Sequence, residues 1–192
     1  MDTTAIIIVA AVVVIVAIGV AVFMQRRTKT LQSRFGSEYD RTVDETGGRM
    51  KAERELSQRA KRVESFDIRP LDPNDRMAYI ERWRGIQAQF VDDPGAAVAG
   101  ADRLLGEVMR KRGYPVADFE QRAADLSVDH ADVVDNYRAA HEIAMRHDRG
   151  DAGTEDLRQA MIHCRALFED LVGLPDGRDR QTQREEERHV RH

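Results

Sequence analysis

Histidine and cysteine are the side chains in this chain whose chemistry best suits metal binding or nucleophilic attack. The sequence holds one cysteine, Cys164, and six histidines: His130, His141, His147, His163, His189 and His192. No two of the histidines have the H-x-x-x-H spacing that places two metal ligands on one face of a helix. The sharpest metal hypothesis therefore joins two helices, and it combines His141 with His163 or Cys164.

A metal site on these residues meets two objections. Cys164 lies on an apolar stripe, where a small buried thiol is the usual arrangement. His163 is its neighbour in the chain, so on a helix the two side chains point about 100° apart and cannot easily serve one site. We therefore predict no metal ligand and no cofactor.

The common catalytic and nucleotide-binding motifs do not occur in this sequence. Neither G-x-G-x-x-G nor G-x-x-x-x-G-K-[ST] is found, and the nucleophile elbow G-x-S-x-G is also missing. The carboxylates are scattered as expected for helix caps and solvated helix faces, so no general acid stands out. We expect no catalytic residue and a protein that is not an enzyme.

One alternative from another functional class stays open. A ligand-sensing or metal-sensing domain, or an enzyme, could have its pocket between the helices that bear Trp83, Tyr137 and His141.

Nucleic acid is not an expected partner, because residues 35–175 contain 21 basic and 28 acidic side chains and no basic stripe interleaved with aromatics.

The elements that must position these side chains begin with an apolar segment. Residues 5–24 read AIIIVAAVVVIVAIGVAVFM, which is twenty residues without a charge. At about 1.5 Å per residue this helix would span about 30 Å, the hydrocarbon thickness of a bilayer. A buried core helix is a poor alternative, because no other part of the chain is comparably apolar. We predict a single N-terminal transmembrane helix over residues 1–24, with the lipid bilayer as a partner.

The charges that flank the apolar segment predict its orientation. No basic residue precedes it, whereas four follow and should lie at the membrane interface: Arg26, Arg27, Lys29 and Arg34. Positive charge next to a membrane helix favours the cytoplasmic side, and this order is the reverse of that in a signal peptide. We therefore predict a cell-membrane protein whose N-terminus is outside and whose C-terminal domain is cytoplasmic. A reversed topology is the alternative.

Residues 25–66 should form a basic juxtamembrane segment and a jointed helical stalk. Gly36 stops one helix, and Ser37 with Asp40 has the S-x-x-D capping pattern that starts another. A second break follows at residues 47–48, where two glycines disfavour helix. The apolar stripe of residues 49–66 is narrow, which suits an exposed stalk or a helix lying along another surface, and it is too short to establish a coiled coil. The first break should be a hinge or a partner contact, formed by Phe35, Gly36, Ser37 and Tyr39.

Residues 67–175 should form a small antiparallel helical bundle. The pairs Asp72-Pro73 and Asp93-Pro94 are helix-start signals, Asp129 should begin a later helix, and Thr154 should cap the last one. Three sets of apolar residues at helical spacing should face the core: Met77, Ile80, Trp83, Ile86, Phe90 and Val91; Val98, Ala101, Leu104, Leu105 and Val108; and Leu157, Ala160, Met161, Cys164, Leu167, Phe168 and Leu171. Residues 176–192 contain one apolar side chain, Val190, and should be a disordered tail.

Four segments, together with the apolar run, resemble an uncharacterised family of single-pass bacterial membrane proteins: LQSRFGSEYDRTVDETG, FDIRPL, RGYPVADFEQRAADLSVDH and EDLRQAMIHCRALFEDLV. The resemblance implies a helical, membrane-tethered protein and brings no reaction, cofactor or catalytic residue. Such proteins often have a proline and a tyrosine where this chain has Ser37 and Cys164.

The sequence as a whole predicts an all-α, membrane-anchored interaction or scaffolding module whose protein partner is unknown. A homo-oligomer is one form that the partnership could take, because Ala17 and Ala21 make a small-x-x-x-small pair on the apolar helix.

Overall fold

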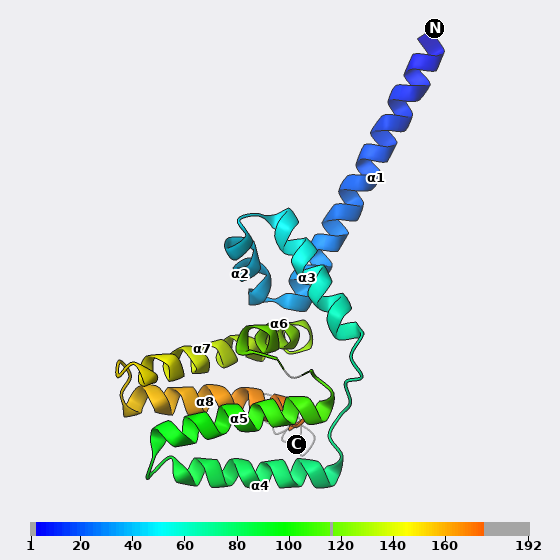
Figure 1. Ribbon diagram of the computed structural model, residues 1–192. Coiled ribbons are helices and arrows are strands. Elements are labelled where there is room, and N and C mark those ends of the chain that lie inside the picture. Colours follow the sequence, from blue (N-terminus) through cyan, green and yellow to red (C-terminus); the bar gives the residue numbers. More distant parts are fainter. Residues whose placement is uncertain (1–2, 116, 175–192) are drawn as a thin grey trace, which may run out of the picture. The chain divides into compact units, whose positions relative to one another are not determined.

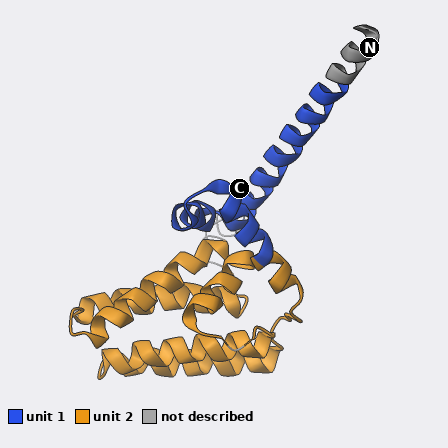
Figure 2. Ribbon diagram, turned by 45° about the horizontal axis from the view of Figure 1, so that its top comes forward, with its two compact units in different colours: residues 1–58 blue, residues 59–192 orange. Residues whose placement is uncertain are grey.

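The computed structural model describes residues 3–115 and 117–174, with side chains from Val12 onward. In these residues it contains eight α-helices and no strand, which confirms the all-α prediction (Figure 1). The chain divides into two compact units, residues 1–58 and residues 59–192 (Figure 2). The stalk and the bundle were predicted to meet a few residues later, at 66–67.

The first unit consists of α1 (Thr3–Phe35), α2 (Ser37–Thr46) and most of α3 (Arg49–Glu64). The predicted break at Gly36 is present, because its φ of 51° takes the chain out of the helix between α1 and α2. Gly47, with a φ of 69°, ends α2 in the left-handed conformation. The predicted S-x-x-D cap is wrong by one residue: Gly36 occupies the N-cap position, and Ser37 is already the first helical residue.

Among the residues with described side chains, no helix combines the length and the apolar character needed to cross a membrane. The side chains of residues 5–11 lie outside the described residues, and the predicted anchor stays a prediction.

The second unit holds the end of α3 and the five helices of the predicted bundle. These are α4 (Pro73–Gln89), α5 (Pro94–Arg112), α6 (Phe119–Asp129), α7 (Ala131–Asp148) and α8 (Thr154–Leu171). In space, α4 packs on α5, α5 on α8, α8 on α7, and α7 on α6 (Figure 1). Both α5 and α7 contact α8, and they also contact each other, so these three helices form the centre of the unit.

Short polar side chains begin three of these helices. The Asp72 carboxylate accepts hydrogen bonds from the amides of Asn74 and Asp75, and Asp93 accepts one from Ala96, each at 2.9 Å. Both starts were predicted from the Asp-Pro pairs. Asp118 begins α6 in the same way, because it accepts from the Gln121 amide at 2.9 Å.

Two predicted helix starts are wrong. Thr154 does not cap α8: the N-cap position belongs to Gly153, whose amide donates to the Asp156 carboxylate at 2.9 Å. Asp129 does not begin the long helix, because it is the last residue of α6, and α7 starts at Ala131 after a break at His130. Each prediction is off by one residue, because the N-cap positions of α7 and α8 belong to His130 and Gly153, which carry no Ser, Thr, Asp or Asn side chain that would mark them in the sequence.

The predicted inward faces of α5 and α8 are confirmed, since every residue in those two sets is buried. On α4, Trp83 is buried and stacks on Phe168 of α8, with ring centroids 4.8 Å apart. Met77 and Val91, predicted to face the core, are instead 66% and 84% exposed. α4 packs chiefly on one helix, so only a narrow strip of its surface is covered, and Val91 lies beyond its end.

The linker that precedes α4 is fastened to the end of α5. The Arg69 amide donates to the Arg112 carbonyl at 2.7 Å. Gly113, which ends α5 with a φ of 106°, lies so close that a Cβ atom there would be 2.2 Å from the Asp67 carbonyl oxygen. The close approach therefore needs a glycine both for its conformation and for its lack of a side chain. The predicted disordered tail, residues 176–192, lies outside the described residues.

Candidate functional site

A pocket of about 280 Å³ lies between α5, α7 and α8 in the second unit. Four buried apolar side chains line it, namely Val98, Ala140, Leu157 and Cys164. Its polar lining consists of Asp102, Arg103, Tyr137, His141, His147 and Asp148. The alternative interpretation of the sequence, a pocket near Tyr137 and His141, thus has a structural counterpart.

Helical spacing brings the lining residues together. On α5, Gly95, Val98 and Asp102 are spaced by three and four residues, and Ala99 lies four residues after Gly95 and three before Asp102, so they share one face of the helix. On α7 the same rule relates Tyr137, His141 and Ala144, among others. The pocket is therefore formed by faces of regular helices rather than by loops.

Asp102 is the centre of the polar contacts at this pocket. Its carboxylate accepts a hydrogen bond from the Tyr137 hydroxyl at 3.0 Å, and the Arg122 guanidinium lies 3.5 Å from its second oxygen. The same guanidinium lies over the Tyr137 ring, 5.7 Å from its centroid. Burial and, secondly, the nearby Asp102 carboxylate raise the pKa of Tyr137 far above its ordinary value, so the hydroxyl is a neutral donor.

The two histidines of the pocket are held in different ways. The His141 ring stacks on Phe119 of α6, with centroids 3.6 Å apart and planes 10° apart. His147 places its Nδ1 atom 3.4 Å from the Ala152 carbonyl oxygen. Its Nε2 atom reaches over the start of α5, where a Cβ atom on Gly95 would lie only 2.7 Å away. Gly95 thus leaves the space that this ring occupies.

Cys164 lines the apolar part of the pocket. Burial raises the pKa of its thiol to about 12, and Asp102 adds to the rise. The thiolate is the nucleophilic and metal-binding form, so this neutral thiol behaves as a small apolar side chain. The structure brings His141 and Cys164 to the same pocket, whereas His163 turns away and its Nδ1 atom lies 2.8 Å from the Asn136 side-chain oxygen.

No group of three or more His, Cys, Asp and Glu side chains within residues 12–115 and 117–174 is arranged to hold a metal ion. Trp83, which the sequence associated with the pocket, is not among the lining residues, because its ring is stacked against Phe168 in the core. Asp102 and His147 were missed. Asp102 lies four residues after Val98 on α5, and His147 lies three residues after Ala144 on α7. Helical spacing could therefore have placed both on the faces that line the pocket.

The residues predicted for the membrane interface lie on the last part of α1. Arg26 and Lys29 are exposed, and Arg34 is half-buried. Arg27 donates to the Ser57 hydroxyl of α3 at 2.9 Å. A second link joins the same helices, because the Thr28 hydroxyl donates to the Glu53 carboxylate at 2.6 Å.

The predicted hinge residues divide into two pairs. Phe35 and Tyr39 are buried, whereas Gly36 and Ser37 are exposed. The Tyr39 hydroxyl donates to Glu53 at 3.2 Å, so this carboxylate receives hydrogen bonds from both α1 and α2. No local pattern in the sequence points to Glu53, because its two partners lie 14 and 25 residues away along the chain.

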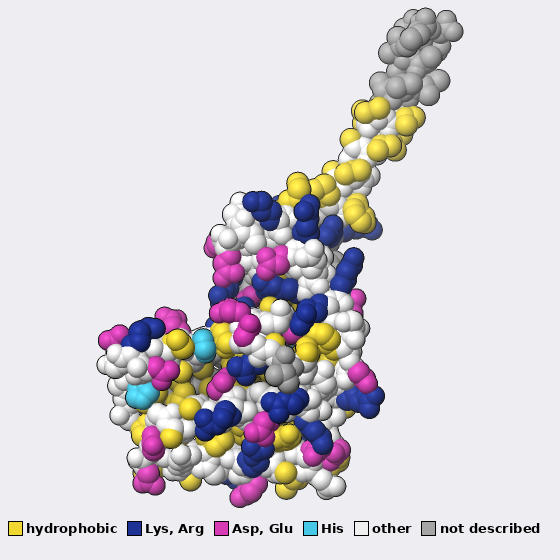
Figure 3. Space-filling view, viewed as in Figure 1, with side chains coloured by type: hydrophobic (Ala, Val, Ile, Leu, Met, Phe, Trp, Pro, Cys, Tyr) yellow, Lys and Arg dark blue, Asp and Glu magenta, His cyan; other side chains and the backbone are white. Residues whose placement is uncertain are grey.

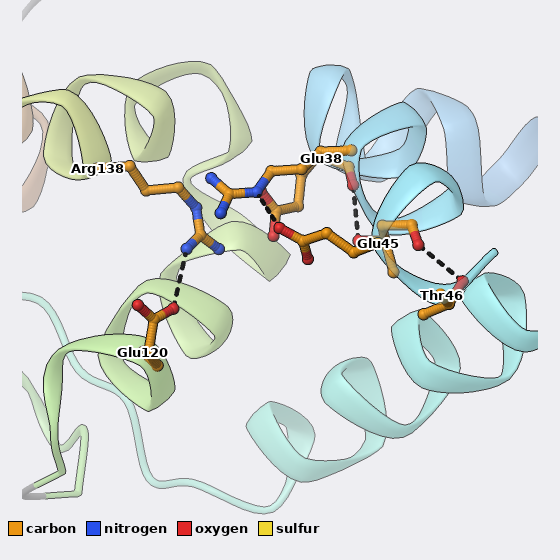
Figure 4. A network of polar contacts seen from close by, with 7 residues as sticks. Glu38, Glu45, Thr46, Glu120 and Arg138 are labelled. Carbon is orange, nitrogen blue, oxygen red and sulfur yellow. Dashed lines mark hydrogen bonds and ion pairs between the residues drawn. The ribbon is translucent and has the colours of Figure 1, made fainter. Parts of the chain in front are cut away.

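Figure 4 shows polar contacts within each of the two units. In α2, the Thr42 hydroxyl donates to the Glu38 carbonyl and the Thr46 hydroxyl to the Thr42 carbonyl, both at 2.7 Å. In the second unit, Arg138 of α7 lies 3.4 Å from the Glu120 carboxylate of α6.

A second polar cluster lies at the end of α5, the start of α7 and the end of α8. The His130 Nδ1 atom is hydrogen-bonded to Asp170, and its Nε2 atom lies 3.4 Å from the Arg112 guanidinium. Arg112 also donates to the Leu171 carbonyl at 3.3 Å. These contacts join three helices around the buried Tyr114 ring, so we assign the cluster a structural role.

Comparison of the chain with protein families, with curated proteins and with solved structures finds no match.

Proposed function

We propose that this protein is a membrane-anchored helical interaction or scaffolding module without enzymatic activity. Its anchor is the single apolar helix at residues 5–24, its N-terminus is outside the cell membrane, and its helical bundle is cytoplasmic. Its partners are the lipid bilayer and another protein, which can be a second copy of the chain.

The observation that supports this proposal most is the apolar surface of α1. Its ten large apolar side chains between Val12 and Met24 are 43% to 68% exposed. Residues 12–16 are consecutive and exposed, so at about 100° per residue their apolar side chains point to all sides of the helix. On the face seen in Figure 3, dark-blue Lys and Arg side chains follow where this apolar part ends. A helix that is apolar all round needs an apolar environment, and a bilayer supplies one. The exposed charges of Arg26 and Lys29 suit the anionic headgroups of a cytoplasmic leaflet.

Apolar side chains on the second unit support a protein partner. Ile162 of α8 is exposed and lines a shallow hollow of about 170 Å³ with Phe90, Met161 and two arginines, Arg158 and Arg165. Apolar side chains rimmed by arginine are typical of protein–protein contact surfaces.

Topology is tested by fusing alkaline phosphatase after His192 and by separating membranes from soluble material. We expect the full chain in the membrane fraction and an inactive phosphatase, because this enzyme needs an oxidising compartment. An active fusion would contradict the cytoplasmic assignment. A full chain in the soluble fraction would contradict the anchor.

Partner binding is tested by a photo-crosslinking residue at Ile162 in the full chain in its own membranes. The matched control places the same residue at Glu142, an exposed charged position on α7. A discrete adduct from position 162 and none from position 142 is the expected result. Equal labelling at both positions, or none at either, would argue against a partner at this surface.

The pocket between α5, α7 and α8 favours a second candidate function, a ligand-sensing domain. Its mixture of buried apolar side chains and a few convergent polar groups is typical of small-molecule sites. A specific small molecule that raises the melting temperature of the purified full chain would support this function.

A further inference from the structure

We propose that the pocket between α5, α7 and α8 binds a small organic cation, a primary amine or amidine with a compact apolar body. This inference rests on the second candidate function, ligand sensing, and it names the chemical class of the ligand.

The charges around the pocket favour a cation. Two carboxylates, Asp102 and Asp148, and one guanidinium, Arg103, line it. The formal charges of these three lining groups sum to −1. Arg122 does not line the pocket, and its guanidinium lies 3.5 Å from only one of the two Asp102 oxygens. An ammonium group gains a charge-assisted hydrogen bond at such a site, whereas a carboxylate ligand would meet repulsion from Asp102.

The hydrogen-bonding groups favour a ligand that donates. A carboxylate has about four acceptor positions, and the contacts from Tyr137 and Arg122 use at most two of those on Asp102. The Asp102 side chain is 43% exposed, so its remaining positions can be reached. The His147 Nδ1 atom lies 3.4 Å from the Ala152 carbonyl oxygen, which can only accept, so the tautomer that pairs with it carries its proton on Nδ1 and has Nε2 as an acceptor.

The polar contacts also hold Asp102 in position before a ligand arrives. Tyr137 is buried, and Arg122 packs over its ring, so neither group has to be ordered on binding. A carboxylate that is fixed in advance costs less conformational entropy when it pairs with a cation.

The apolar lining and the volume set the size of the ligand body. Val98, Ala140, Leu157 and the neutral Cys164 thiol offer apolar contact without a hydrogen-bonding demand. The volume of about 280 Å³ lies just below the range for drug-sized ligands, about 300 to 1,000 Å³. A single ring with a short aminoalkyl arm, such as benzylamine, is of a suitable size.

The test uses the full chain in nanodiscs and three probes of similar shape, namely benzylamine, benzyl alcohol and benzoate. Binding is measured by calorimetry, and the melting temperature of each variant reports its folding. Asp102→Asn removes the charge but keeps an acceptor for Tyr137. Ala99→Trp changes an exposed lining residue and obstructs the pocket. Glu81→Gln is the control, because it removes a carboxylate from α4, which does not line the pocket.

We expect benzylamine to bind the wild type and the Glu81→Gln variant equally, and to bind Asp102→Asn and Ala99→Trp at least tenfold more weakly. Benzoate should not bind. If benzyl alcohol or benzoate binds as tightly as benzylamine and Ala99→Trp abolishes this, the cation proposal is overturned while a ligand pocket remains. If no probe binds, or if benzylamine binds Ala99→Trp unchanged, both the cation proposal and the sensing function at this pocket are overturned.

Discussion

Two buried tyrosines of the second unit, Tyr114 and Tyr137, differ in the partner of the hydroxyl group. The Tyr137 hydroxyl donates to Asp102, whereas the Tyr114 hydroxyl is buried and has no hydrogen-bond partner among the described residues. A buried polar group without a partner costs about 1 to 3 kcal/mol. The same chemical change should therefore have opposite effects at the two positions.

We expect Tyr114→Phe to raise the free energy of unfolding by about 1 kcal/mol and Tyr137→Phe to lower it by about 1 to 2 kcal/mol. Each variant serves as the control for the other, since both lose one hydroxyl and keep the ring. Urea denaturation measures both values. Changes of the same sign would mean that the hydroxyl groups do not differ in the way described.

Gly113 offers a second test at the scale of one residue. An alanine there would place its Cβ atom 2.2 Å from the Asp67 carbonyl oxygen and would keep an unfavourable φ of 106°. We expect Gly113→Ala to lower the free energy of unfolding by about 3 kcal/mol, since backbone strain alone costs about 1 to 3 kcal/mol. The matched control is Gly85→Ala inside α4, where the added Cβ atom has no neighbouring atom within 4 Å. This variant should raise the free energy of unfolding by up to about 1 kcal/mol, because alanine favours helix more than glycine does. Equal effects at the two glycines would rule out the close approach of the linker.

At the scale of helices, the links to Glu53 join α3 to α1 and α2 within the first unit. Glu53→Ala would leave the Thr28 and Tyr39 hydroxyls without this acceptor, and Tyr39 is buried. We expect the first unit to lose about 1 to 2 kcal/mol of stability. Faster amide hydrogen exchange in residues 26–58 would report the loss.

Lys51→Ala provides the control for that experiment, because Lys51 is an exposed residue of the same helix. It should leave the exchange rates almost unchanged. If both variants speed exchange equally, the helix itself and not the Glu53 contacts would be responsible.

The positions of the helices could be predicted from this sequence more reliably than the way in which the helices pack against one another. The buried faces of α5 and α8 could be predicted from the spacing of their apolar residues, because each of these helices packs against at least two other helices and so buries a broad face. The exposure of Met77 depends on which part of α4 meets α5, and this is decided by packing between helices rather than by local pattern. The same limit applies to the site: Tyr137 and His141 were associated with a pocket, but their relation to Asp102 depends on contacts 35 or more residues apart.

For the molecule as a whole, buried thiol and phenol groups predict that the free energy of unfolding falls at alkaline pH. Burial raises the pKa of Cys164 from 9.0 to about 12 and that of Tyr114 from 10.0 to about 12. The folded state therefore keeps these protons at a pH at which the unfolded chain releases them. The stability that the neutral groups provide is complete below about pH 9 and is lost between about pH 9 and pH 12.

We expect the free energy of unfolding to fall between pH 8 and pH 11, and to fall less in Cys164→Ala than in the wild type. Met145→Ala removes an apolar side chain that does not titrate and should leave the fall unchanged. Urea denaturation at the two pH values measures the difference. A fall of the same size in both variants would show that the thiol does not contribute.

The hydrogen bond between the Arg69 amide and the Arg112 carbonyl has a mechanical consequence when the chain is pulled from its amino-terminal side. Tension applied on the amino-terminal side of Asp67 reaches this bond and the Gly113 contact before it reaches α4. The linker therefore transmits the force to the end of α5, and α4 is not pulled away from α5 until these contacts break. In single-molecule pulling between Arg59 and Leu174, Gly113→Ala should lower the force of the first rupture, and an unchanged force would contradict this role.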